Sequence, residues 1–407
     1  MTTLPLAGIK VIDATTVVMG PYAAQWLADF GAEVIKVETP MGDSTRHTGP
    51  STEDGMSSVF LGVNRNKKSV VIDLKQTSGQ ETLLQLMGTA DVFMHNMRPQ
   101  KLGAVGLDPA QVRQAFPRLV YAGLHGFGQA GPYGGRPAYD DIIQGLSGNA
   151  ALMALQTGVP RYFPTIAADK TSALVVGMSI LAALMQRNAT GIGAFVEIPM
   201  FETMVAFNLV EHLYGEHFEP ALAGAGYPRV MAPSRRPHQT SDGFVCMMPY
   251  TNPHWQRFFT AVGEPGLASD TRFCSMSART QNIEALYQTL AQFVIQKSTG
   301  YWVDLCDQLE IPAGRMNDLA DLKNDPHLQA TGFFHPVEDA AMGTLRFTGV
   351  PVLFDGVRPP ITTPPRLGAD TESVLLQAGL SPERIASLMA SGAVGTSRLK
   401  SDGVDPI

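Results

Sequence analysis

Several residue patterns that mark common protein classes are missing from this chain. Its 407 residues include three cysteines and no Cys-x-x-Cys pair, so we do not expect a disulfide framework. The first residues, MTTLPLAG, lack the basic start and apolar core of a signal peptide. These absences fit a reducing compartment, and we expect the protein to be cytoplasmic.

Basic charge and long apolar runs are scarce as well. The net charge of −7 disfavours nucleic acid as a partner, because nucleic-acid binding needs basic patches. The most apolar stretch, Ala173 to Met185, contains Gly177 and Ser179 and is too short to cross a bilayer. We therefore expect a buried helix there, and neither nucleic acid nor a membrane as a partner.

Motifs for metal binding and serine hydrolysis are also missing. The segment HLYGEH places His212 and His217 five residues apart, whereas a zinc-binding helix needs histidines at i and i+4 on one face. No Gly-x-Ser-x-Gly is present. We expect no metal site, and His125 and His254 remain isolated candidates for acid–base chemistry.

What the chain does contain is an alternation of strand and helix patterns. Residues 9–13 and 33–37 read as strands around a helix at 21–30 that ends at Gly31, which makes a βαβ unit. The alternation predicts a Rossmann-like α/β domain, with a mostly parallel sheet covered by helices on both faces. Further strands are predicted at 69–74, 91–95, 118–123 and 194–198, and further helices at 78–87 and 170–187.

The amino-acid composition of the chain changes near Gly224. Residues 224–243 are rich in Gly, Pro and Arg and read as a linker. We predict a large α/β domain in 1–220, a linker and a smaller α+β domain in 221–330, and a return to the large domain with a C-terminal tail in 331–407. The tail beyond Gly392 is expected to be loose.

The segment GFGQAGP, residues 126–132, has the glycine spacing of a dinucleotide-binding turn. Such a turn follows a strand and opens a helix whose N-terminus receives the pyrophosphate. A strand pattern precedes this segment, but the residues that follow Ala130, GPYGGRP, disfavour a helix. We expect a glycine-rich loop with a use other than NAD binding.

Asp169 precedes an almost wholly apolar helical stretch and permits two interpretations. As a structural residue it would cap the first turn of the helix. As a functional residue it would be an anion favoured by the helix N-terminus, and apolar walls would strip it of water and make it a nucleophile. The basic residues Arg65, Lys67 and Lys68 likewise fit either a phosphate contact or a solvated strand entry.

Five segments together resemble the class III CoA-transferases, also called the CaiB/BaiF family. In the order and spacing of that family, over nearly the whole length, the chain contains LAGIKVIDATTVVMGPYAAQWLADFGAEVIKVETPMGD, NRNKKSVVIDLK, ADVFMHNMRP, GFGQAGPYGGRPAYDDIIQGLSG and ADKTSALVVGMSILAALMQRNATGIG. The resemblance implies an acyl-CoA:carboxylate CoA-transferase that moves CoA from an acyl-CoA to a free carboxylic acid. It implies CoA as a co-substrate and no permanently bound cofactor.

The same resemblance implies roles for particular residues. Asp169 would attack the acyl-CoA thioester to give an aspartyl anhydride, and the released thiolate would convert this anhydride into an enzyme–CoA thioester. The GFGQAGP loop would lie beside the thioester end of CoA. A family arginine near Ala104 is missing, and Lys101 or Arg98 would replace its charge. CoA contacts are implied at Val18, Met19, Thr39, Ile72, Asp73, Leu74, Lys75, Asn96, Met97, Arg98, Arg136, Pro137, Ala138 and Tyr139.

Two alternatives to the transferase stay open. A 2-methylacyl-CoA racemase of the same family would carry Gly-His-Asp where this chain has Ala138-Tyr139-Asp140, so one of its two bases is absent here. A non-catalytic CoA-binding paralogue would not need Asp169. The acids exchanged are not determined by the sequence, and Arg235 and Arg236 suit either a second substrate carboxylate or a solvated linker.

The resemblance also implies a quaternary structure. A chain that leaves its large domain near residue 220 and returns near residue 330 forms an open ring. In this family, two such rings interlock into a homodimer. We expect the same arrangement here, with subunits that separate only on unfolding.

Overall fold

The computed structural model describes residues 3–395, which divide into two units with dense internal contacts. Unit 1 comprises the described residues up to Ser147, Thr165–Met204, and the described residues from His327 onward. Unit 2 comprises Gly148–Pro164 and Val205–Pro326. The chain therefore enters unit 1 three times. The domain boundaries near residues 220 and 330 stay predictions.

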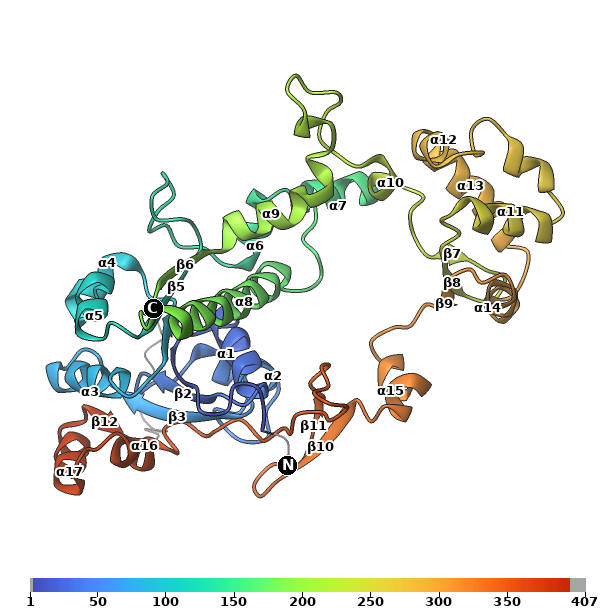
Figure 1. The fold of residues 1–407 in the computed structure, drawn as a ribbon. Helices are drawn as coiled ribbons and strands as arrows, with labels where there is room; N and C mark the ends of the chain where they lie inside the picture. Colours follow the sequence, from blue (N-terminus) through green and yellow to red (C-terminus); the bar gives the residue numbers. More distant parts are fainter. Residues whose placement is uncertain (1–2, 396–407) are drawn as a thin grey trace. The chain divides into compact units, whose positions relative to one another are not determined.

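A seven-stranded sheet forms the centre of unit 1 (Figure 1). Its order is β12-β3-β2-β1-β4-β5-β6, and all neighbouring strands are parallel except the edge pair of β12 and β3. Each of the six strands predicted for this sheet is present, and the mostly parallel α/β fold is confirmed. The strands are β1 Lys10–Ala14, β2 Glu33–Glu38, β3 Lys67–Ile72, β4 Val92–His95, β5 Val120–His125, β6 Phe195–Pro199 and β12 Val394–Gly395.

Helices cover both faces of this sheet, because successive strand residues face two different cores. Val11 packs in the core that contains α1 and α8, whereas its neighbour Ile12 packs in the core that contains α3, α16 and α17. This explains why the strands read as continuous apolar runs. The helices of unit 1 are α1 Met19–Asp29, α2 Ser58–Val63, α3 Thr77–Met87, α4 Pro99–Leu102, α5 Pro109–Ala115, α6 Asp140–Leu146, α8 Ala167–Thr190, α16 Thr371–Gln377 and α17 Pro382–Ser391.

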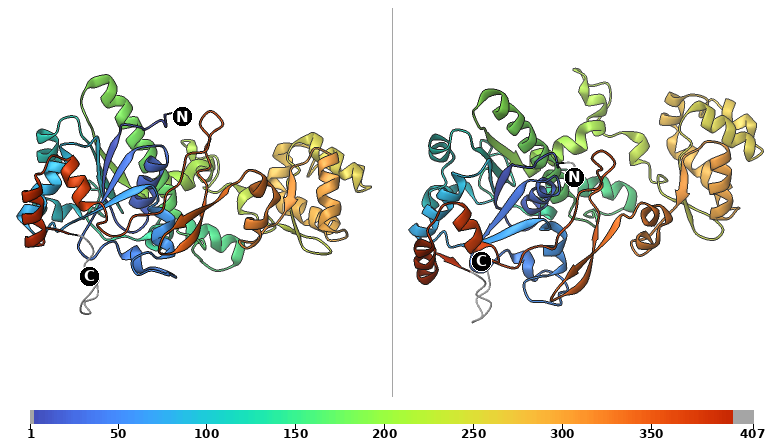
Figure 2. Two further views of the ribbon diagram at one scale, coloured as in Figure 1. Left: turned by 90° about the horizontal axis from the view of Figure 1, so that it is seen from below. Right: turned by 60° about the horizontal axis from the view of Figure 1, so that its bottom comes forward.

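The C-terminal part of the chain packs beside the N-terminal strands, as the red and blue segments of Figure 2 show. Val394 of β12 pairs with Ile72 of β3, and the Asp73 amide donates to the Ala393 carbonyl at 2.9 Å. Ala393 and Val394 are buried. The expectation of a loose tail beyond Gly392 is therefore wrong for these residues, because they complete the sheet edge. Residues 396–407 lie outside the described part of the chain.

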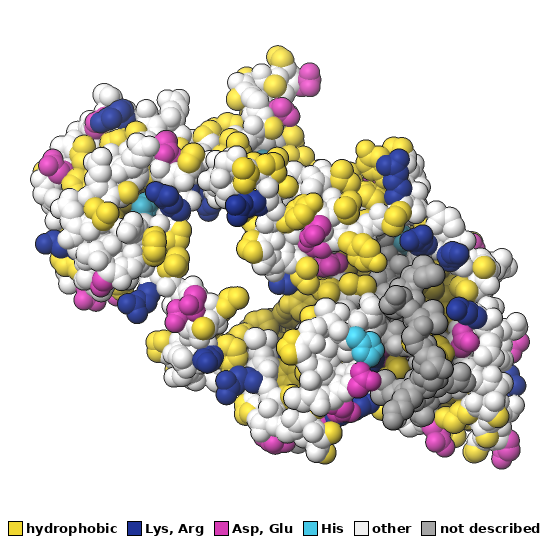
Figure 3. Space-filling view, turned by 180° about the vertical axis from the view of Figure 1, so that it is seen from behind, with side chains coloured by type: hydrophobic (Ala, Val, Ile, Leu, Met, Phe, Trp, Pro, Cys, Tyr) yellow, Lys and Arg dark blue, Asp and Glu magenta, His cyan; other side chains and the backbone are white. Residues whose placement is uncertain are grey.

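Helix α8 is longer than the apolar stretch that predicted it. Within the described residues it is the one helix with the length and composition to cross a membrane, and 44% of its apolar window is buried inside the protein. Val176 and Ile180 pack in the core, whereas Met178 and Met185 are 61% and 74% exposed. The expectation of a buried helix is therefore correct for one face of α8 only, since the other face is exposed. Figure 3 shows that hydrophobic side chains (yellow) reach the surface in several other places.

Unit 2 contains a small antiparallel sheet packed with helices. The order of its strands is β7-β8-β9, and Trp255, Phe258 and Trp302 lie at the centre of its core. This agrees with the predicted smaller α+β part. The elements of this unit are α7 Asn149–Thr157, α10 Pro228–Met231, β7 His238–Gln239, β8 Phe244–Met247, α11 Asn252–Ala261, α12 Met276–Gln281, α13 Ile283–Val294, α14 Thr299–Gln308 and β9 Ala313–Arg315.

Two further helices and two further strands connect the parts described above. Helix α9, Met200–His212, runs from unit 1 into unit 2, and α15, Pro326–Ala330, begins at the point of return. In unit 1 the chain then forms an antiparallel hairpin of β10, Phe334–Asp339, and β11, Gly343–Thr348.

Candidate functional site

The residues predicted to contact CoA come at or after the carboxyl ends of β1 to β5. They lie in the turn after β1, after β2 at Thr39, at the end of β3, after β4 and in the long loop after β5. Because parallel strands end at the same edge of a sheet, these segments gather along one edge. Open α/β sheets bind ligands at this edge.

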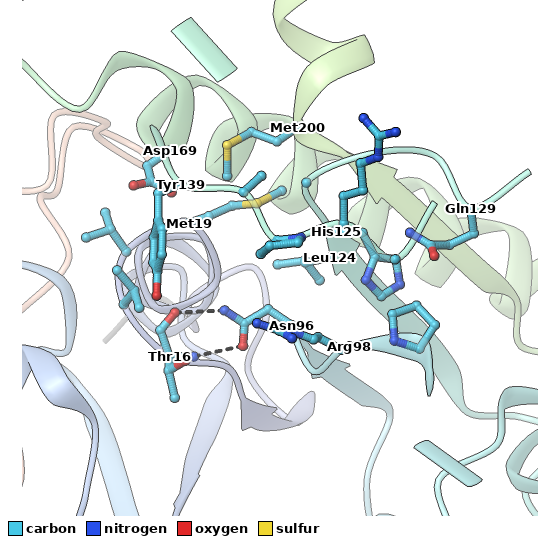
Figure 4. Close-up of a pocket in the computed structure, with 18 residues that line it drawn as sticks. Thr16, Met19, Asn96, Arg98, Leu124, His125, Gln129, Tyr139, Asp169 and Met200 are labelled. Atoms are coloured by element: carbon cyan, nitrogen blue, oxygen red, sulfur yellow. Dashed lines mark hydrogen bonds between the residues drawn. The ribbon is translucent and has the colours of Figure 1, made fainter. Parts of the chain in front are cut away.

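A cavity of about 230 Å³ lies at this edge of the sheet (Figure 4). Asp169 contributes to its wall from the first turn of α8. Thr39, Met97, Lys101 and residues 72–75 are not among the residues that line it. The other predicted residues in its wall are Val18, Met19, Asn96, Arg98, Arg136, Pro137, Ala138 and Tyr139.

The cavity also includes residues that the sequence reasoning did not select. Most of them are neighbours of selected residues in the same loops, so the continuity of the loops was a usable signal. Met200 is different, because it comes from α9 and only the tertiary structure brings it to the site. His125 was an acid–base candidate, and Gly126 and Gln129 belong to the GFGQAGP loop expected beside CoA; all three line the cavity. The residues not selected are Thr16, Val17, Pro99, Leu124, Gly135 and Met200.

Asp169 lies in the first turn of α8 but does not cap the helix. The cap position belongs to Ile166, which has no side chain able to accept the free amides. Oδ1 of Asp140 accepts hydrogen bonds from the amides of Ala168 at 2.8 Å and Asp169 at 3.0 Å. The interpretation of Asp169 as a cap is therefore wrong, and Asp140 performs that function from α6.

The carboxyl group of Asp169 has a strongly shifted pKa. Burial raises this pKa to about 7, the Asp140 carboxylate raises it as well, and a hydrogen bond from the Met19 backbone amide lowers it. Desolvation thus outweighs the helix N-terminus, contrary to the expectation that the terminus would favour the anion. Near neutral pH, Asp169 is divided between its acid and its carboxylate form.

The GFGQAGP segment is a loop without a following helix, as predicted, and α6 begins only at Asp140. Its amides are already bound within the protein: the Gly128 amide donates to Glu202 at 2.9 Å, and the Gln129 amide donates to Glu197 at 2.6 Å. In a dinucleotide-binding turn such amides would face a pyrophosphate. Here the carboxylates of Glu202 and Glu197 accept from these amides in place of a pyrophosphate, which argues against NAD binding at this loop.

Position 126 requires glycine because its backbone lies against Ala138, at the other end of the same loop. A Cβ atom at this position would lie 2.4 Å from the Cβ of Ala138. Residues 126 and 138 therefore close the loop against itself, with Arg136, Pro137, Ala138 and Tyr139 at the cavity.

His125 is the one histidine among the described residues that line the cavity. Burial lowers the pKa of His125, so its imidazole is neutral at neutral pH. Tyr139 lines the same cavity and is 70% exposed. Within residues 3–395, no group of three or more His, Cys, Asp or Glu side chains is arranged to hold a metal ion.

Arg65, just before β3, and Lys67, its first residue, form internal ion pairs. Arg65 pairs with Asp29 at 2.7 Å and Lys67 pairs with Asp13 at 2.9 Å, and both basic side chains are buried. Both interpretations of these two residues, a phosphate contact or a solvated strand entry, are therefore wrong. The sequence did not show that their partners lie in the preceding strand and helix.

A second cavity, of about 320 Å³, lies on another side of the turn after β1. Val18 lines both cavities. The second cavity is also lined by Ile166, the cap residue before α8, and by Lys170, which follows Asp169 in α8. Lys170 is exposed, and its ammonium group donates to the Thr165 hydroxyl at 2.5 Å. The remaining lining residues are Tyr22, Gln25, Trp26, Gly62, Val63, Arg65, Phe333, Thr348, Gly349 and Pro351.

Comparison with known proteins identifies the family. The model of CoA-transferase family III matches residues 6–371, and the chain belongs to this family. A probable fatty acyl-CoA transferase of Mycobacterium tuberculosis is 30% identical over 387 residues, which cover 91% of this chain and 97% of that protein. Human succinyl-CoA:glutarate CoA-transferase is 28% identical over 400 residues, covering 96% of this chain and 90% of that protein.

A solved structure agrees with this assignment. The crystal structure of a CaiB/BaiF family protein from Brucella suis matches with a TM-score of 0.77 at 28% identity, over 93% of this chain and 100% of that chain. The resemblance found in the sequence is thereby confirmed. The protein is an enzyme of the family III CoA-transferase class.

Proposed function

We propose that this enzyme transfers CoA between carboxylic acids through covalent intermediates on Asp169. The observation that carries the proposal is the position of Asp169, a buried carboxylate with a pKa of about 7 in the wall of the strand-end cavity. Perturbed carboxylates in clefts are candidates for nucleophiles.

The proposed steps conserve atoms and charge without an external oxidant or acid. The Asp169 carboxylate attacks the donor thioester, which forms an aspartyl acyl anhydride and expels CoA thiolate. The thiolate attacks the Asp169 carbonyl, which forms an enzyme–CoA thioester and releases the donor acid. The acceptor carboxylate then attacks this thioester, which expels CoA thiolate and forms a second aspartyl anhydride. The thiolate attacks the acceptor's carbonyl in this anhydride, which forms the new acyl-CoA and releases the Asp169 carboxylate.

Burial of Asp169 supports this chemistry. The free carboxylate is a poorly solvated anion, as its raised pKa shows. Conversion to an anhydride or a thioester replaces that buried charge with a neutral group. The environment that disfavours the anion therefore favours the covalent intermediates. The Met19 amide, at the N-terminus of α1, is available as a donor to oxygen at the reacting carbon.

The two cavities suggest where the substrates bind. CoA would occupy the cavity formed by the predicted contacts Val18, Met19, Asn96, Arg98 and 136–139. The remainder of the acyl group or acid would occupy the second cavity, because that cavity shares Val18 and is lined by Lys170, the residue after Asp169. The contacts predicted at Thr39, 72–75, Met97 and Lys101 stay predictions, and the identity of the acids is open. Arg235 and Arg236 are exposed residues of unit 2.

The racemase alternative is less well supported by the cavity. A racemase needs two bases, one on each face of the carbon beside the thioester. Tyr139 occupies the position of its histidine, and a phenol is a poorer base than an imidazole at neutral pH. A racemisable 2-methylacyl-CoA in deuterated water should therefore gain no deuterium at this carbon.

Incubation with an active acyl-CoA donor tests the transferase proposal. CoA should become attached to Asp169, visible as an intact-mass increase that hydroxylamine removes, and labelled donor acid should exchange into acyl-CoA without an acceptor. Asp169→Ala and Asp169→Asn should form no adduct and lose turnover. Asp141→Asn, an exposed aspartate on α6, serves as the matched control. Near-normal exchange in Asp169→Ala would refute the proposal.

We further propose that the enzyme is a homodimer. The exposed face of α8 carries Leu174, Met178 and Met185, which are 47%, 61% and 74% exposed and recur along one side of the helix. An apolar stripe of this kind on a helix otherwise packed in a core suits burial by a second subunit. The interlocked arrangement and a cytoplasmic location stay predictions.

A further inference from the structure

The turn between β1 and α1 forms one wall of the cavity around Asp169. Residues 16–19 line this cavity together with Asp169, and the Met19 backbone amide is close enough to the Asp169 carboxyl group to lower its pKa. Within the turn, Val17 has a φ of 71°. This left-handed conformation is unfavourable for a β-branched side chain, so contacts from outside the turn must hold it.

Two side chains hold the backbone of this turn. Asn96 accepts a hydrogen bond from the Thr16 amide at 3.1 Å and donates one to the Thr16 carbonyl at 2.9 Å (Figure 4). Asp43 accepts a hydrogen bond from the Val17 amide at 3.2 Å. Asn96 follows β4 and Asp43 follows β2, the two strands that flank β1. The turn is therefore held from both sides.

Asp43 is in turn fixed by a buried ionic network. Its second oxygen pairs with Lys36 at 2.9 Å, and the Lys36 ammonium also donates to the Thr15 carbonyl at 2.9 Å. The Asp43 amide donates to Glu38 at 3.0 Å, and Glu38 pairs with Arg46 at 2.8 Å. These four charged side chains are at most 3% exposed. Buried ion pairs are often no more stabilising than apolar packing, so stability alone does not account for this network.

We propose that Asp43 and Asn96 are positioning residues for the reaction at Asp169. Together they clamp Val17 in its left-handed conformation, which directs the Met19 amide at the Asp169 carboxylate and fixes the wall of the cavity. The inference rests on the proposed role of Asp169. Asp43 does not line the cavity, so its effect on the reaction passes through the turn.

Two neutral replacements of the Lys36–Asp43 pair test this role. Lys36→Gln with Asp43→Asn keeps an oxygen that can accept from the Val17 amide, whereas Lys36→Met with Asp43→Leu removes it. Both double variants make the same change in charge. We expect the Met/Leu enzyme to form the CoA adduct on Asp169 about 100-fold more slowly than the Gln/Asn enzyme, the size of loss caused by a small misplacement of reacting groups.

The pH dependence gives a readout that a role in stability alone would not change. In the Met/Leu enzyme the Met19 amide is no longer directed at Asp169, and this hydrogen bond lowers the pKa of Asp169. The midpoint of adduct formation should therefore move to higher pH in the Met/Leu enzyme but not in the Gln/Asn enzyme. Thermal unfolding of both enzymes measures any general loss of stability separately.

Val17→Gly provides a rescue experiment. Glycine adopts a positive φ without strain, so the conformation no longer depends on the clamp. Introduced into both double variants, Val17→Gly should reduce the difference between them from about 100-fold to a few-fold. Equal rates in the two double variants, or a difference that glycine leaves unchanged, would overturn the proposal.

Asn96→Leu supplies a second arm if either double variant fails to fold, because Asn96 is only partly buried. If Asn96→Leu slows adduct formation because the clamp on Val17 is lost, Val17→Gly should partly restore the rate. If the rate falls because a CoA contact is lost, Val17→Gly should not restore it. An Asn96→Leu enzyme that glycine does not rescue would therefore refute the clamp. If the unaltered enzyme forms no adduct on Asp169, the proposed function itself fails, and this result is distinct from either outcome.

Discussion

Asp140 caps the helix that carries Asp169, with one carboxylate oxygen 3.0 Å from the Asp169 amide nitrogen. This arrangement places two acidic side chains, both at most 8% exposed, beside each other. The amides at the start of α8 that would otherwise favour an Asp169 anion are bound to Asp140. The charge of Asp140 raises the pKa of Asp169 further. Asp140 thus raises the pKa of Asp169 and also caps the helix that carries it.

Asp140→Asn should lower the pH at which Asp169 becomes reactive. The amide oxygen can still cap α8, but the negative charge that raises the Asp169 pKa is lost. The rising limb of adduct formation against pH should therefore move to lower pH. Asp141→Asn, on the adjacent exposed residue, is the control and should leave the limb in place. If the rising limb of adduct formation stays near pH 7 in Asp140→Asn, the charge of Asp140 does not contribute to the raised pKa of Asp169.

Asp169→Asn should stabilise the protein at neutral and alkaline pH. The pKa of Asp169 is raised from 3.8 to about 7, so between these values the unfolded chain releases a proton that the folded chain retains. Stability is therefore lost as pH rises through this window, by up to about 4 kcal/mol if the full shift applies. The asparagine variant avoids this loss. Its Tm advantage should be present at about pH 8 and vanish near pH 4. An equal Tm advantage at the two pH values would show that titration of the Asp169 carboxyl group is not the source of the advantage.

Gly62→Leu should narrow the range of acids exchanged. Gly62 lines the second cavity, and a Cβ at this position meets nothing within 4 Å, so a larger side chain projects into open space. Exchange with long acids should fall by about tenfold or more relative to acetate. Gly300→Leu is the matched control, since Gly300 is also helical and unobstructed but lies in unit 2. Unchanged selectivity in Gly62→Leu would place the acid elsewhere.

Met178→Glu should prevent the assembly of subunits. A carboxylate in the middle of the exposed α8 stripe would be desolvated by a second subunit at a cost of several kcal/mol. Light scattering of the unaltered enzyme should give about twice the 43.7 kDa chain mass, and dilution to nanomolar should leave its activity per subunit unchanged. Met41→Glu changes a residue that is 69% exposed outside α8 and should leave the dimer intact. A monomeric unaltered enzyme at micromolar concentration would refute the dimer, and subunit exchange within minutes would exclude an interlock.

The sequence by itself determined the parallel sheet and the position of Asp169. Strand patterns such as IKVID and EVIKV are apolar on both faces, and only a sheet covered on both sides buries such residues. Helical stretches between them follow from the same local spacing. Asp169 was selected because it precedes an apolar helical stretch and stands where the resembled family has its catalytic aspartate, although the sequence left a role as a helix cap open. These signals are local, so no knowledge of distant contacts was required.

Tertiary structure alone decided the environment of that carboxylate. The sequence suggested an anion favoured by a helix end, but burial of Asp169 raises its pKa, and Asp140, 29 residues earlier, takes the helix amides and raises the pKa further. The ion pair of Lys67, the left-handed Val17 and the pairing of Val394 with β3 likewise depend on residues far apart in the chain. Desolvation and charge pairing depend on what surrounds a group in space, and neighbours in sequence do not supply that information.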